Sequence, residues 1–154
     1  MNHPNYDKLT YVEVPNRAAT CHTDWDRVAS ALQQALSKPP GGLEANGILT
    51  IDCYPGVDEN EINASLAALQ PTRTIRSTEA YLTPTGIDAK VLPHNGGDDP
   101  VFGVINHLRI DDFLDAKKTA SLQQEIDNTD AGLIVIIGTG ASRIHPGDVF
   151  VYAD

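Results

Sequence analysis

The most constraining feature of the sequence is the uninterrupted apolar segment 131–137, AGLIVII, which contains the longest apolar run of the chain. Runs of this kind are typical of parallel strands, because helices cover both faces of such a sheet. The run is far too short to cross a bilayer as a helix. We therefore expect a central strand of a parallel sheet enclosed by helices.

Strand-like and helix-like segments alternate along the rest of the chain. Further strands are expected at 9–14 (an edge strand), 47–54, 73–77, 101–106 and 148–153. Because helical segments separate the strands and crossovers are right-handed, the pattern favours an open, layered sheet. We predict an α/β fold, with three α/β/α layers around a mostly parallel sheet, formed by a single domain over 1–154.

Three helices are expected between these strands. Thr23 should cap the first helix, which ends before Pro39, and Asp58 should cap the second. The third is expected at 111–127, where acidic residues at its start cap and solubilise it. The apolar positions expected on the first two helices are Trp25, Val28, Ala29, Leu32, Leu36, Ile62, Leu66 and Leu69.

The charge balance argues against two classes of partner. The chain has 11 Lys and Arg against 21 Asp and Glu, a formal net charge of −10. Binding to nucleic acid depends on basic side chains that displace counterions from phosphates. Attraction to an anionic membrane also needs lysine and arginine. We expect neither nucleic acid nor a membrane as a partner.

The cysteine content indicates the cellular compartment. Only Cys21 and Cys53 are present, without a CxxC motif, and the first residues, MNHPNYDK, show neither a charged leader nor an apolar stretch. A reduced, cytoplasmic setting is therefore expected.

The first candidate binding loop follows the expected strand 47–54, where a nucleotide-binding protein carries GxxxxGK[ST]. Such a loop needs glycines, a lysine for the outer phosphates and a hydroxyl for Mg²⁺. Here one glycine stands among acidic residues, which would repel phosphate. The loop is either a turn before an acid-rich helix start or one wall of a small-ligand cleft. The candidate contacts are Asp52, Tyr54, Pro55 and Gly56.

The second candidate loop, GTGASRI at 138–144, follows the central strand. Small residues at a strand end let backbone N–H groups approach an anion, and Arg143 could add positive charge. A structural turn is the alternative, because the sequence that follows looks like a connection and not a long helix. The candidate contacts are Gly138, Gly140, Ser142 and Arg143.

Other polar residues offer weaker signals. His107 and Arg109, with the acidic pair at 98–99, could line a polar pocket. No metal site is expected, because a zinc site needs three or four converging ligands and the histidines are isolated. A triad of Ser142, His145 and an aspartate is rejected, because the GxSxG elbow is absent.

Several short stretches resemble the N-terminal region of long-form bacterial mannose-6-phosphate isomerases. They are NYDK at 5–8, DCYPGV at 52–57, DPVFG at 99–103, IDDFLD at 110–115, GTGA at 138–141 and VYAD at 151–154. The resemblance implies a non-catalytic accessory domain that precedes a cupin domain, its expected partner. The zinc ligands and the base for interconverting mannose 6-phosphate and fructose 6-phosphate would lie in that cupin, and no cofactor is implied before it.

The layout is also similar to uridine kinase-like proteins, which implies a P-loop kinase-like topology with a degenerate phosphate loop. Three hypotheses follow. The first is an accessory domain of a sugar-phosphate isomerase in carbohydrate metabolism, with a cleft for a small phosphorylated ligand. The second is a phosphotransferase that uses Asp52 as base and Arg143 as phosphate clamp. The third is an assembly module that packs on the cupin domain or on a second copy of the chain.

Overall fold

The computed structural model of the chain describes residues 15, 22, 24–37, 46–97 and 105–154. Its centre is a parallel sheet in the order β2-β3-β1-β4. The strands are β1 (Asn46–Cys53), β2 (Arg73–Arg76), β3 (Gly132–Gly138) and β4 (Val149–Ala153). Each of them was expected from the sequence to within a few residues.

One face of the sheet is covered by α1 (Trp25–Leu36), α2 (Glu59–Ser65) and η2 (Leu66–Leu69). Alternate strand residues point to alternate faces, so Val135 and Ile137 of β3 face this layer. The core on this side consists of Leu36, Leu49, Ile51, Cys53, Ile62, Leu66, Val135 and Ile137.

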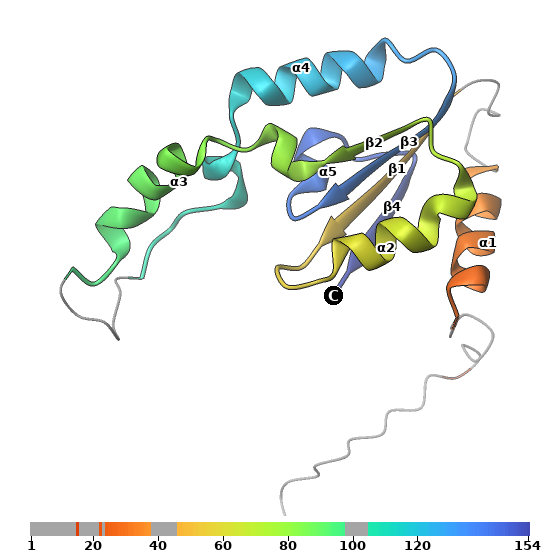
Figure 1. The fold of residues 1–154 in the computed structure, drawn as a ribbon, viewed down its shortest axis with the longest axis horizontal. Helices are drawn as coiled ribbons and strands as arrows, with labels where there is room; N and C mark the ends of the chain where they lie inside the picture. The colour runs from red at the N-terminus through yellow and green to blue at the C-terminus, as the bar shows by residue number, and fades with distance from the viewer. Residues whose placement is uncertain (1–14, 16–21, 23, 38–45, 98–104) are drawn as a thin grey trace, which may run out of the picture.

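The opposite face is covered by η3 (Ser77–Ala80), α4 (Ala116–Asp127) and α5 (Ala141–Ile144). Ile134 and Ile136 of β3 face this second layer. Its core consists of Ile75, Ala80, Leu122, Ile126, Ile134, Ile136, Ala141 and Ile144. With a helical layer on each face, the predicted three-layer α/β fold is confirmed (Figure 1).

The strand order makes the connections that follow β1 and β3 run in opposite directions across the sheet. The connection from β1 to β2 passes β3 through α2, whereas the connection from β3 to β4 passes β1 through α5. Since α2 and α5 pack on opposite faces, the chain leaves the adjacent ends of β1 and β3 in opposite directions. In open α/β sheets, ligands collect at such a switch point.

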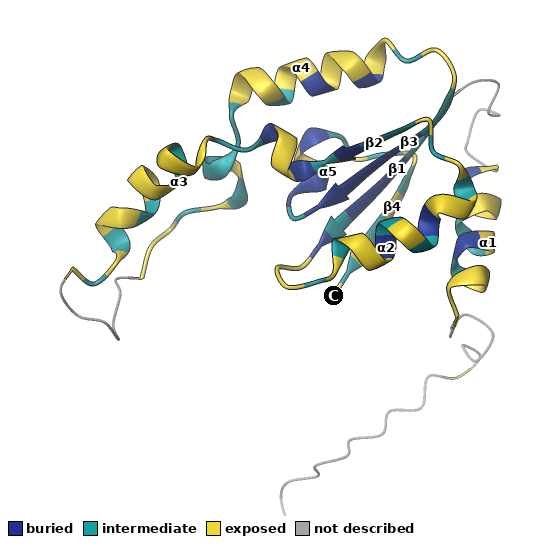
Figure 2. Cartoon of the chain, viewed as in Figure 1, coloured by how far each residue is buried: buried dark blue, intermediate teal, exposed yellow. Residues whose placement is uncertain are grey.

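A helical arm was not expected from the sequence. α3 (Pro84–Val91) and η4 (Leu92–His94) extend away from the sheet (Figure 1). Thr83 caps α3 by accepting the N–H of Gly86, and Pro84 starts the helix where no N–H is needed. No residue of α3 is buried (Figure 2), so this helix contributes nothing to the core. Its apolar spacing gave no stripe that would mark a helix.

Three details of the expected elements are wrong. The N-cap of α1 is Asp24, which accepts the N–H of Arg27, in place of the predicted Thr23. Trp25 is 39% exposed and does not belong to the core. α4 begins at Ala116, because Asp115 caps it and the preceding Ile110–Phe113 form the 3₁₀ turn η5.

Two further predictions concern residues at the margins of the described chain. The expected strand 9–14 lies outside the described residues, and so do positions 101–104 of the expected strand 101–106. Ile105 and Asn106, which are described, belong to no strand. In the described part of the chain, no helix is both long and apolar enough to span a membrane.

Candidate functional site

The Asp52 carboxylate connects the ends of β1 and β3. It accepts hydrogen bonds from the N–H of Gly140 at 2.8 Å, from the N–H of Ser142 at 3.3 Å and from the Ser142 hydroxyl. The register brings this about, because Asp52 pairs with Gly138 and its side chain points to the face that α5 covers. The structure thus brings together Asp52, Gly140 and Ser142, which the sequence analysis named as candidate contacts after two different strands. We call Asp52 and the turn 138–142 the strand-end site.

The turn of the strand-end site needs its two glycines. Gly138 has a φ of +125° and Gly140 a φ of +76°. Residues other than glycine rarely adopt these backbone conformations. A Cβ at Gly140 would lie 2.5 Å from Cγ1 of Ile110. A Cβ at Gly138 would lie 2.3 Å from Oγ of Ser77. The turn is therefore packed against η3 and η5.

A half-buried tyrosine supports the same turn. The Tyr81 hydroxyl donates to the carbonyl oxygen of Thr139 at 2.7 Å and also hydrogen-bonds to Ser77, which is 1% exposed. Burial raises the pKa of Tyr81 above its ordinary value of 10.0, and the nearby Glu59 and Asp52 carboxylates act in the same direction. The Tyr81 hydroxyl therefore fixes the turn through the hydrogen bond that it donates to Thr139.

The loop between β1 and α2 is exposed where the sequence predicted ligand contacts. Tyr54 is 60% exposed, and its carbonyl oxygen accepts the N–H of Val57 across a turn formed by Pro55 and Gly56. Gly56 has a φ of +108°, and a Cβ there would have no neighbour within 4 Å. This glycine is needed for its backbone conformation and not for close approach of a ligand.

The N-terminus of α2 is also satisfied by a carboxylate of the chain. Oδ1 of Asp58 accepts the N–H groups of Asn60 at 3.0 Å and Glu61 at 3.2 Å, as predicted for a capping residue. In a phosphate loop these are the donors that would face a phosphate. Beside them, Arg76 donates to Oδ1 of Asn60 at 2.8 Å and lies 3.7 Å from Oε2 of Glu59.

The predicted cationic contacts lie away from Asp52. Nε of Arg143 pairs with Oδ1 of Asp111 at 3.3 Å, between α5 and η5. Arg109 and His107 are exposed, and the N–H of Arg109 donates to Asp112 at 2.7 Å. Among the described residues, none of these three side chains hydrogen-bonds to Asp52 or to the turn 138–142.

Outside the strand-end site, the described residues offer few groups suited to metal binding or catalysis. In the described ranges, no group of three or more His, Cys, Asp and Glu side chains could hold a metal ion. Burial raises the pKa of the Cys53 thiol, which is 2% exposed. Nδ1 of His145 accepts the N–H of Gly147 at 3.0 Å, and Ser142 donates to Asp52, so Ser142 and His145 form no catalytic pair.

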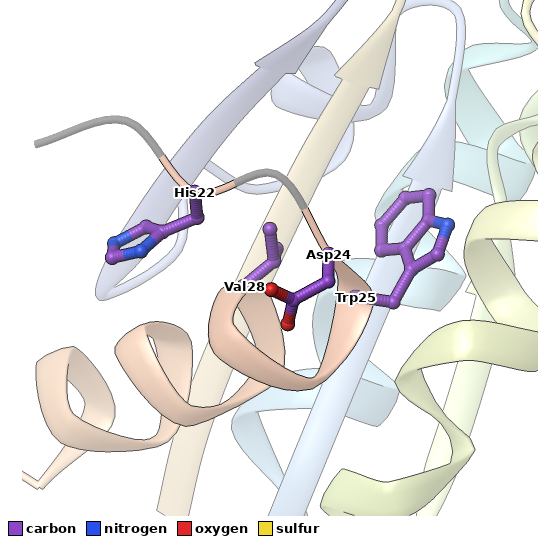
Figure 3. Close-up of a pocket in the computed structure, with 4 residues that line it drawn as sticks. All are labelled: His22, Asp24, Trp25 and Val28. Atoms are coloured by element: carbon purple, nitrogen blue, oxygen red, sulfur yellow. The ribbon is translucent and has the colours of Figure 1, made fainter.

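A surface hollow of about 210 Å³ lies at the start of α1 (Figure 3). His22, Asp24, Trp25 and Val28 line it. The Trp25 indole N–H donates to Oε1 of Glu61 at 3.4 Å, and Asp24 is occupied as the helix cap. The polar groups of Asp24 and Trp25 are therefore already used by the chain itself.

Sequence reasoning missed the residues that support the turn from β2. Ser77 was expected only as the last residue of the strand 73–77, and Tyr81 lies in a stretch without helical or strand periodicity, so no local pattern marked either as part of the site. Glu59 was read only as part of an acidic helix start, although its carboxylate lies within 3.1 Å of the Cβ position at Gly138.

Comparisons with known proteins give one match. A family model described as a domain of unknown function (DUF8485) matches residues 24–154. No curated protein and no solved structure matches the chain.

Proposed function

The chain belongs to the DUF8485 family, and we propose that its domain is a non-catalytic accessory module in which two potential anion sites are closed by the chain's own carboxylates. One is the turn 138–142, closed by Asp52, and the other is the N-terminus of α2, closed by Asp58. The module acts by contacting other molecules and not by converting a substrate.

The observation that carries this proposal is the position of the Asp52 carboxylate. A phosphate bound after β3 would need the N–H groups of Gly140 and Ser142, and Asp52 already accepts both. A second negative charge at hydrogen-bond distance from the same donors would be repelled strongly in this half-buried setting. The turn therefore favours a closed structural role over anion binding.

The same geometry weakens the phosphotransferase hypothesis. A general base must reach the proton that it removes, but both oxygens of Asp52 are engaged with Gly140 and Ser142. The proposed phosphate clamp, Arg143, is paired with Asp111. Phosphoryl transfer depends on positive charge around the transferred group, and neither loop supplies it.

The proposal also concerns the kind of protein that the module serves. The resemblance of the sequence to long-form mannose-6-phosphate isomerases suggests that the module serves a sugar-phosphate isomerase whose cupin domain holds the zinc and the catalytic base. The buried free thiol of Cys53 is compatible with a reduced, cytoplasmic setting. The coding sequence downstream of residue 154 tests this part, because it should encode clustered histidines and glutamates in frame.

Calorimetric titration tests the absence of catalysis and of phosphate binding. We expect no saturable heat when the domain is titrated to millimolar concentrations of Mg²⁺-ATP, uridine, mannose 6-phosphate or fructose 6-phosphate. Saturable heat with any phosphorylated compound, lost in a variant of the turn 138–142, would contradict the proposal.

A further inference from the structure

The outer strand β4 leaves two aromatic rings uncovered. Phe150 is 55% exposed and Tyr152 is 57% exposed, whereas Val149, Val151 and Ala153 on the other face of the strand pack against the core. Figure 2 shows the contrast with the buried neighbouring strand β1. In the described part of the chain, β4 has a partner strand on one side only.

This exposure is unusual for the architecture. Parallel sheets occur almost only with both faces covered. On this face α5 covers the adjacent strand, where Thr50 is fully buried and donates to the carbonyl oxygen of His145. Among the described residues the cover ends at Thr50, although Thr50 pairs with Phe150 in the register. An open edge with exposed aromatic rings is a template for a further strand.

The charges around β4 indicate which kind of molecule could pair with its open edge. Val149–Ala153 contains no charged residue, but exposed carboxylates stand at both ends, on Asp148 and Asp154. If β4 paired with a second copy in antiparallel fashion about Val151, Asp148 would lie opposite Asp154 of that copy. Like charges directly opposite each other destabilise a strand pair, and the net charge of −10 adds repulsion.

We propose that β4 is a docking strand for an extended, basic peptide segment of a partner protein. The segment adds to the open edge of β4, places apolar side chains on the rings of Phe150 and Tyr152, and brings lysine or arginine near Asp148 and Asp154. Backbone hydrogen bonds supply affinity in this mode, while the rings and the flanking charges select the partner.

Two matched peptides test the proposal on the intact chain. One alternates valine and threonine and carries two lysines at each end, and the other replaces these lysines by glutamates. In an NMR titration, the basic peptide should shift the amides of Val149–Ala153 saturably, and its Kd should rise about tenfold in 0.5 M salt. The acidic peptide should bind at least about tenfold more weakly.

Two double variants distinguish docking at β4 from nonspecific binding to exposed apolar side chains. The double variant Phe150→Thr and Tyr152→Thr removes exposed rings, so it should keep the fold by circular dichroism but raise the Kd about tenfold or more. The control variant, Leu92→Thr and Ile105→Thr, removes two apolar side chains elsewhere that are even more exposed, and it should bind like the parent chain.

Three results would overturn the proposal. The first is no shift of β4 amides with either peptide. The second is equal binding of the basic and acidic peptides. The third is concentration-dependent dimerisation that the ring variant abolishes, because the occupant would then be a second copy of the chain.

Discussion

Asp52 and Ser142 are joined by a hydrogen bond between a carboxylate and a hydroxyl, although 90 positions separate them in the sequence. The bond fastens the end of β1 to the first turn of α5, at the point where the chain leaves β1 and β3 toward opposite faces. A position that holds ligands in related sheet architectures is thus closed by internal contacts.

Removing the Asp52 side chain should destabilise the domain markedly. Asp52→Ala leaves the N–H groups of Gly140 and Ser142 without an acceptor in a half-buried turn, and hydrogen bonds to charged groups each contribute about 1.5–3 kcal/mol. We expect the free energy of unfolding in urea to fall by about 3 kcal/mol. Asp130→Ala, which removes an exposed carboxylate in the loop between α4 and β3, should change this free energy by less than about 0.5 kcal/mol. Equal effects of the two substitutions would refute the closed turn.

The two glycine turns should respond differently to alanine. Gly138→Ala and Gly56→Ala both place a side chain at a positive φ, but only the Cβ at Gly138 meets another residue, Ser77. Strain alone should lower the stability of Gly56→Ala by about 1–2 kcal/mol. Gly138→Ala should lose a further 1–3 kcal/mol, roughly, from overpacking. Thermal denaturation of both variants checks this order, and a reversed order would mean that Gly138 is not packed as described.

Removing the capping carboxylate of α2 should have a smaller effect. Asp58→Ala leaves the N–H groups of Asn60 and Glu61 to water, and loss of a cap costs about 1 kcal/mol. Asp58→Ser keeps a capping oxygen and should retain most of the stability. Urea denaturation of the two variants provides the comparison. If serine were as damaging as alanine, the carboxylate would have a role other than capping.

The stability of the domain should decline at alkaline pH partly through Tyr81. The pKa of Tyr81 is raised above 10.0 in the folded state, so the folded chain holds a proton that the unfolded chain releases. This contribution is complete below pH 10 and is lost as the pH rises toward the higher folded pKa. Burial also raises the pKa of the Cys53 thiol above its ordinary value of 9.0, so Cys53 likewise lowers the stability of the folded chain at alkaline pH.

Tyr81→Phe isolates the contribution of the phenol. The variant should be less stable at pH 7 by about 1 kcal/mol, because the carbonyl of Thr139 loses its donor. Its stability should then fall less steeply than that of the parent chain above pH 10. Parallel curves of unfolding free energy against pH would show that Tyr81 ionises equally well in the folded state.

The sheet could be predicted from the sequence because its signals are local. The apolar run of β3 and the Pro55–Gly56 break after β1 each mark an element without reference to the rest of the chain. Asp58 was recognised as a cap for the same reason, since the N–H groups that donate to it lie two and three residues away. The fold class followed from the alternation of these elements.

The inner contacts of the strand-end site depend on distant residues and were only partly predictable. Asp52 and Ser142 were both named as candidate contacts, but the bond between them depends on which face Asp52 points to. Tyr81 and Ser77 reach the turn from β2, whose place beside β3 no sequence pattern indicated. Arg143 was expected to face the site, whereas its partner Asp111 comes from the η5 turn.

The measurement that tests the closed turn most directly is an NMR titration of the ¹⁵N-labelled chain with inorganic phosphate. The account predicts that the amide resonances of Gly140, Ser142, Asn60 and Glu61 do not shift saturably, because Asp52 and Asp58 occupy these donors. Saturable shifts of Gly140 and Ser142 at millimolar phosphate would contradict it, since phosphate would then have displaced the Asp52 carboxylate.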